Sequence, residues 1–114
     1  PRAVPAGIYA RTWLEKSGLW AAVKKKIIPA DNVRAAMAVV EAGNADAGIV
    51  YKTDAAISRK LKIAFEITDG PPITYPAAVL SDSRQPQAAR KFLAYLAEKP
   101  ADEIFRKFGF SVID

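Results

Sequence analysis

Three residues of this chain offer neutral hydrogen-bond donors at the predicted ends of helices or strands. Ala6 lies at the predicted start of one helix, and Val33 lies two residues after Asp31, whose side chain can cap another. Tyr51 lies near the end of a short apolar run that predicts an interior strand. The first N–H groups of a helix have no partner inside it and carry roughly half a positive charge. Two helix starts and a hydroxyl therefore predict a site for a tetrahedral oxyanion.

Each of these residues also has a purely structural explanation. Ala6 can be a helix start and nothing more, Val33 can be a packing residue, and a tyrosine at a strand end often packs its ring. The oxyanion hypothesis therefore depends on the three donors converging in the folded protein.

The residue types exclude most catalytic and metal-binding sites. The sequence contains no histidine and no cysteine, which removes Ser-His-Asp and Cys-His catalysis, thiolate metal sites and most zinc sites. No pair of carboxylates has the spacing of an acid and base couple, and no glycine-rich phosphate loop is present. We therefore predict a binding protein that is not an enzyme, with no cofactor and no metal held directly by side chains.

Composition indicates a globular domain with a basic surface. The 114 residues are 51% hydrophobic and 25% charged, with a formal net charge of +5. No apolar run is long enough to span a membrane, and no signal-like segment is present. The basic residues are scattered apart from Lys24, Lys25 and Lys26, without interleaved aromatic residues. This pattern predicts a solvated basic face that can steer an anion, and no nucleic-acid partner.

Helical and extended patterns alternate along the chain, so the predicted fold class is α/β. Apolar residues recur with helical spacing, and short apolar or alternating runs indicate strands. The predicted helices span 8–17, 19–25, 31–42, 87–97 and 100–108, and a single helical turn is predicted at 56–60. The predicted strands span 27–28, 47–51, 62–67 and 73–80. Gly18, Gly43 and Gly109 are predicted to end helices, because glycine adopts the left-handed conformation that a helix end requires.

Four stretches carry a family pattern. They are Val-Pro-Ala-Gly-Ile-Tyr-Ala at 4–10, Pro-Ala-Asp-Asn-Val-Arg-Ala-Ala at 29–36, Gly-Ile-Val-Tyr-Lys-Thr-Asp-Ala at 48–55 and Glu-Ile-Phe-Arg-Lys-Phe-Gly-Phe at 103–110. In order and spacing they resemble the periplasmic molybdate-binding proteins of ABC transporters. The similarity runs over essentially the whole chain, as expected of a member of that family.

The resemblance implies a two-lobed fold of the periplasmic-binding-protein type II kind, which holds molybdate or tungstate through neutral donors only. It implies that the backbone N–H groups of Ala6 and Val33 and the hydroxyl of Tyr51 are three of those donors. Two serines would come from the N-terminal half of the protein, which precedes this chain. Residues 1–75 would then be most of one lobe, and residues 76–114 a crossover strand and the C-terminal helices of the other.

The expected function follows from the resemblance. This chain would be the C-terminal fragment of an exported, periplasmic protein that delivers molybdate or tungstate to an ABC permease, with molybdenum present only as the bound oxyanion. Because incomplete lobes leave apolar helix faces exposed, we expect a complex with the missing N-terminal half or a rearranged homodimer. The alternatives are an oxyanion-sensing effector domain of a transcriptional regulator, a module that binds no ligand, and an enzyme on the same architecture.

Overall fold

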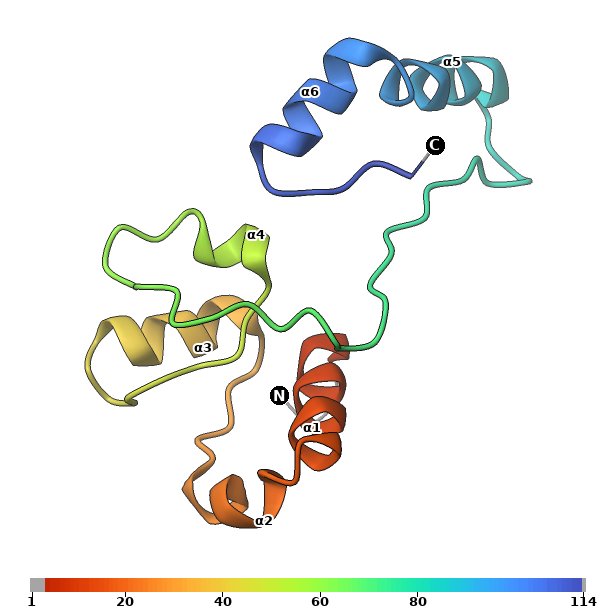
Figure 1. Ribbon diagram of the computed structural model, residues 1–114. Helices are drawn as coiled ribbons and strands as arrows, with labels where there is room; N and C mark the ends of the chain where they lie inside the picture. Colours follow the sequence, from red (N-terminus) through yellow and green to blue (C-terminus); the bar gives the residue numbers. More distant parts are fainter. Residues whose placement is uncertain (1–3, 114) are drawn as a thin grey trace. The chain divides into compact units, whose positions relative to one another are not determined.

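The computed structural model describes residues 4–113, and its regular structure in that range is helical (Figure 1). In chain order, the elements are α1 (Pro5–Lys16), α2 (Trp20–Val23), the 3-10 turn η1 (Lys24–Lys26), α3 (Val33–Glu41), α4 (Lys52–Ala55), α5 (Pro86–Leu96) and α6 (Lys99–Lys107). The five predicted helices are therefore confirmed, with boundaries that differ by a few residues. The single helical turn predicted at 56–60 is misplaced, because the structure has its helical turn, α4, at Lys52–Ala55, whose polar sequence was interpreted as a loop.

The predicted strands are wrong for the chain by itself. None of the residues 4–113 belongs to a strand, and the segments 27–28, 47–51, 62–67 and 73–80 are irregular. A strand exists only where its backbone groups bond to a neighbouring strand, and these segments find no such neighbour within the described residues. The described residues therefore form the helices of the predicted α/β fold but none of its strands.

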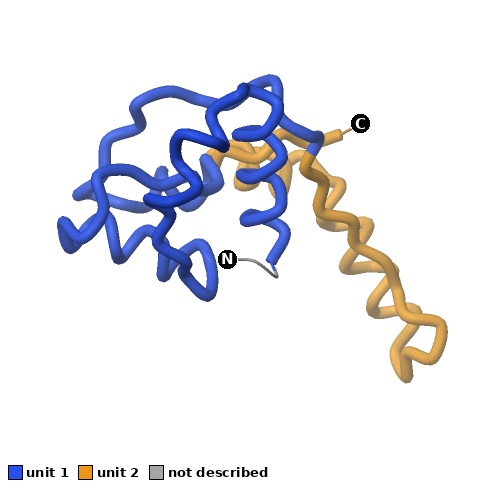
Figure 2. The backbone as a smooth tube through the Cα atoms, turned by 90° about the horizontal axis from the view of Figure 1, so that it is seen from below, with its two compact units in different colours: residues 1–72 blue, residues 73–114 orange. Residues whose placement is uncertain are grey.

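The chain divides into two compact units, which Figure 2 draws in separate colours. Unit 1 comprises Pro1–Pro72 and unit 2 comprises Ile73–Asp114. The division follows Pro71 and Pro72, two residues that cannot donate a backbone hydrogen bond. The assignment of residues 1–75 and residues 76–114 to two different lobes refers to the full-length protein, so it stays a prediction.

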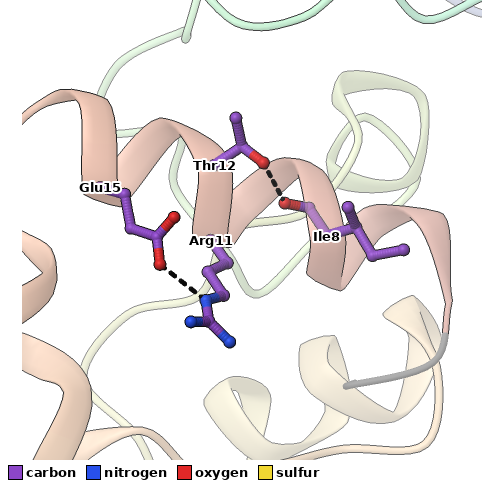
Figure 3. A network of polar contacts seen from close by, with 4 residues as sticks. All are labelled: Ile8, Arg11, Thr12 and Glu15. Atoms are coloured by element: carbon purple, nitrogen blue, oxygen red, sulfur yellow. Dashed lines mark hydrogen bonds and ion pairs between the residues drawn. The ribbon is translucent and has the colours of Figure 1, made fainter.

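Helix α1 begins as its sequence predicts. Pro5 occupies the first helical position, where its missing N–H is no loss. Figure 3 shows two contacts that follow the helical spacing: the Thr12 hydroxyl donates to the Ile8 carbonyl at 2.9 Å, and Arg11 Nε donates to Glu15 Oε1 at 2.8 Å. The Arg11 guanidinium also lies 4.8 Å from the ring centroid of Trp20, which links α1 to α2 by a cation–π contact.

Long-range side-chain contacts in unit 1 anchor the segment that follows α4. Trp13 of α1 lies against Phe65, with ring centroids 6.1 Å apart, and its indole Nε1 donates to Asp69 Oδ1 at 2.9 Å. Lys16 Nζ donates to the Asp69 carbonyl at 3.3 Å. The polar end of an indole needs such a partner whenever its ring is covered. Side chains of α1 therefore contact the segment after α4 at two residues, Phe65 and Asp69.

Unit 2 is built on the pair α5 and α6, which pack against each other. Gly109, at φ +90°, ends α6, and the Phe110 N–H donates to the Phe105 carbonyl at 3.0 Å. The rings of Phe105 and Phe110 meet edge to face at 6.1 Å, and Tyr75 meets Phe110 in the same way at 5.7 Å. The predicted helix stop at Gly109 is confirmed, together with the hydrophobic contact that accompanies this type of cap.

The described residues bury very little apolar surface. Among residues 4–113, only Ala6 and Ala101 are buried, and none of the large side chains there is fully buried. The surface area of the chain is 9581 Å², whereas two separate compact domains of these sizes would expose about 7,300 Å² together. This excess holds however the two units are placed, so the two units together leave surface uncovered that two compact domains would bury.

Candidate functional site

Ala6 lies in the first turn of α1 and is one of the two buried residues, at 9% exposure. Pro5 precedes it at the first helical position, so Ala6 carries the first N–H group of the helix. The next N–H, that of Gly7, donates to the Val4 carbonyl at 3.0 Å. The Ala6 N–H has no acceptor inside the helix, as is normal for the first turn.

Val33 is the first residue of α3, and the cap before it is Asn32 rather than the predicted Asp31. The Asn32 side chain accepts a hydrogen bond from the Ala35 N–H at 2.9 Å. The Asn32 backbone is extended, with φ −154° and ψ 176°, as a cap requires. The signal that sequence reasoning missed was Asn32 itself, which is as good a cap as aspartate and stands immediately before the apolar stripe.

This cap predicts a specific pair of stability effects. Asn32→Ala should destabilise the folded protein by about 1 kcal/mol, because the Ala35 N–H loses its acceptor. Asp31→Ala is the matched control and should change stability by less than about 0.5 kcal/mol, since Asp31 lies outside the helix and is exposed. Urea unfolding of both variants measures the difference, and equal effects would contradict the assignment of the cap.

Tyr51 lies immediately before α4 and is half-buried. Its backbone is extended, with φ −71° and ψ 146°, and its carbonyl accepts hydrogen bonds from Asp54 N–H at 3.1 Å and Ala55 N–H at 3.0 Å. The strand that was predicted to end here is absent, but the residue still marks the point where the irregular segment 47–50 turns into a helix. Its position is thereby fixed by the first turn of α4.

The structure brings two of the three predicted residues to one pair of helices. α3 and α4 pack against each other, and Figure 1 shows both of them beginning at the same end of this pair. Val33 and Tyr51 therefore belong to neighbouring helix starts. Ala6 lies in the same unit, but α1 packs against α2, and we find no pairing of similar extent between α1 and α3 or α4 among the described residues.

The charges around the helix starts suit an anion. The first turns of α1 and α3 contain no acidic side chain, and the one acidic residue beside the α3 start is the exposed Asp31, which lies outside the helix before its cap. The first turn of α4 contains Asp54. Within residues 4–113 no three acidic side chains gather in a way that could hold a metal ion. The chemistry available at these positions is hydrogen bonding from neutral groups in a weakly positive field.

None of the helices in the described range is both long and apolar enough to cross a membrane.

Comparison with known proteins identifies the class. The chain belongs to the family of bacterial extracellular solute-binding proteins, whose family model matches residues 1–111. It is 42% identical over 113 residues to the putative ABC transporter substrate-binding lipoprotein YvgL of Bacillus subtilis. It is also 39% and 37% identical to the molybdate-binding proteins ModA of Escherichia coli and Haemophilus influenzae, over 114 and 113 residues.

These relatives are much longer than the chain. Each comparison covers 97% or 98% of this chain but 44% of the relative. The matching part is the C-terminal part of those proteins, as the resemblance in sequence implied.

Proposed function

We propose that this chain is part of an extracytoplasmic solute-binding protein that captures molybdate or tungstate. The observation that carries the proposal is that α1 and α3, both in unit 1, begin without an acidic residue in their first turns. Two relatives at 37% and 39% identity are named as molybdate-binding proteins, which supports the same ligand. The backbone N–H groups of Ala6 and Val33 and the hydroxyl of Tyr51 would each donate one hydrogen bond to the anion.

The mechanism is capture without turnover. A tetrahedral dianion needs several directed donors, and helix starts supply both N–H groups and a favourable field without a discrete countercharge. Sulfate carries the same charge but is smaller, so it would leave donors under-satisfied in a cavity sized for molybdate. All three proposed ligands from this chain are neutral hydrogen-bond donors, so we expect the bound anion to leave unchanged.

The cellular role follows from the family. In the complete protein, two lobes of the type II kind would close on the anion and present it to an ABC permease. Residues 1–75 and residues 76–114 would belong to different lobes of that protein. The family description as extracellular and the name of one relative as an ABC transporter lipoprotein support export and a permease partner. We place the complete protein in the periplasm or an equivalent extracytoplasmic position.

Calorimetric titration of the full-length protein with molybdate, and with sulfate as the competing anion, tests the ligand. Tyr51→Phe removes one hydroxyl and keeps the ring, so molybdate affinity should fall about 10- to 150-fold, the effect of one hydrogen bond to a charged ligand. Tyr95→Phe is the matched control on α5 of unit 2, which carries none of the three proposed donors, and it should bind as the wild type does. An unchanged affinity of Tyr51→Phe would remove Tyr51 from the site, and equal binding of sulfate and molybdate would overturn the proposed selectivity.

A further inference from the structure

Val33 and Tyr51 begin two neighbouring stretches of helical chain that are joined again at their far ends. α3 starts at Val33 and ends at Glu41. The second stretch starts at Tyr51, passes through α4 and reaches Ser58. The Ser58 hydroxyl donates a hydrogen bond to the Glu41 carboxylate. A side-chain contact therefore connects the two stretches at the end opposite to the two proposed donors.

The stretch from Tyr51 to Ser58 is continuously hydrogen-bonded. Each backbone N–H from residue 54 to residue 58 donates to a carbonyl three or four residues earlier, at 3.0 to 3.2 Å. The first of these bonds is to the Tyr51 carbonyl, and the last is from the Ser58 N–H. Closed local hydrogen bonds make a stretch of chain stiff, because each fixes the backbone dihedrals between its donor and its acceptor. A displacement of Ser58 is therefore passed on to Tyr51.

The Ser58 hydroxyl is held in one orientation. Its oxygen accepts hydrogen bonds from the backbone N–H groups of Lys60 and Leu61, both at 3.3 Å. A serine hydroxyl has a single proton to donate, and here that proton goes to Glu41. The residue is half-buried. Ser58 thus ties the loop after α4 to the last residue of α3 through one oxygen atom.

The chain that leads into Tyr51 lies directly on α3. A Cβ atom at Gly48 would stand only 3.3 Å from Cγ2 of Val40, so a side chain there would crowd α3. Three residues from Gly48 to Tyr51 span up to about 10 Å. Seven helical residues from Val40 back to Val33 also span about 10 Å. Because α3 and α4 begin at the same end of their pair (Figure 1), this segment is just long enough to bring Tyr51 to the level of Val33.

We propose that Glu41 and Ser58 are positioning residues for the anion site. Their hydrogen bond fixes the angle between the two stretches, and thereby the distance between the Val33 N–H and the Tyr51 hydroxyl. This role rests on the proposed function, since it concerns the same donors, and it adds a structural origin for the discrimination by size. Donors at a fixed separation cannot close on a smaller anion, whereas a loosened pair can.

Titration calorimetry of full-length Ser58→Ala with molybdate and with sulfate tests the positioning role. Molybdate affinity should fall about 3- to 10-fold, the range that one net protein hydrogen bond corresponds to, and the ratio of molybdate to sulfate affinity should fall with it. Ser58→Thr keeps the hydroxyl and should bind molybdate within about twofold of the wild type. Ser83→Ala is the matched control, because it removes a hydroxyl that accepts the Gln85 N–H at 3.2 Å in unit 2.

A double-mutant cycle with Tyr51→Phe separates positioning from a general loss of structure. In the Tyr51→Phe background, Ser58→Ala should lower molybdate affinity by less than about twofold, because the hydroxyl that Ser58 positions is gone. A purely structural effect would be the same in both backgrounds. Glu41→Ala removes the acceptor of the same hydrogen bond and should reproduce the losses of Ser58→Ala, which gives a second variant if one of them folds poorly.

The outcomes distinguish this role from the proposed function. If Tyr51→Phe weakens molybdate binding but Ser58→Ala and Glu41→Ala bind both anions as the wild type does, the positioning role is overturned and the proposed function stands. Equal losses from Ser58→Ala in both backgrounds would also overturn the positioning role. Failure of the wild type to bind molybdate, or an unchanged affinity of Tyr51→Phe, would reject the proposed site and the positioning role with it.

Discussion

This chain alone is expected to bind molybdate about 10²- to 10⁴-fold more weakly than the full-length protein. The proposed site takes three donors from this chain, at Ala6, Val33 and Tyr51, and the family resemblance implies two serine hydroxyls from outside the matched region. Each hydrogen bond to a charged ligand contributes about 1.5 to 3 kcal/mol, so the loss of two should cost about 3 to 6 kcal/mol.

Calorimetric titration of both forms with molybdate under the same ionic strength measures this difference. Addition of the missing polypeptide in trans is the control, and it should restore most of the affinity if the two parts assemble. Equal affinity of the chain and the full-length protein would show that this chain contains the whole site. No binding by a folded full-length protein would instead reject the oxyanion assignment itself.

Val33→Pro in the full-length protein is expected to weaken molybdate binding about 10- to 150-fold while leaving stability nearly unchanged. Val33 is the first residue of α3, where proline is well tolerated because the N–H is not used inside the helix. Asn32 before it is extended, at φ −154° and ψ 176°, a conformation that proline accepts in the preceding residue. The substitution therefore removes the proposed donor with little disturbance of the helix.

The matched control is Val33→Ala, which shortens the side chain and keeps the N–H. It should retain molybdate affinity within about twofold, whatever small change in stability the lost packing causes. Urea unfolding of both variants separates a binding effect from a folding effect. If Val33→Pro binds as tightly as the wild type, the N–H of Val33 is not a ligand donor, and Ala6 and Tyr51 would have to be tested without it.

Local features of the chain were predictable because they depend on neighbours in sequence. Gly18, Gly43 and Gly109 all adopt positive φ at helix ends, as predicted. Pro5 opens α1 as predicted. Capping of α3 was assigned one residue too early, since Asp31 and Asn32 are equally good caps and only the backbone conformation distinguishes them. The family was also identifiable from four short stretches, because their residues and spacing occur together.

The sequence by itself thus determined the five longer helices to within a few residues at their ends. The assignment of Ala6, Val33 and Tyr51 as neutral donors to an anion stays a prediction. Only the tertiary structure decided that Val33 and Tyr51 start neighbouring helices, since the packing of α3 on α4 joins parts of the chain separated by a loop. It also decided that segments with strand patterns, such as 62–67, remain unpaired among the described residues. A helix closes its hydrogen bonds within its own sequence, whereas a strand needs a second segment, and no sequence pattern can supply a partner that the chain does not contain.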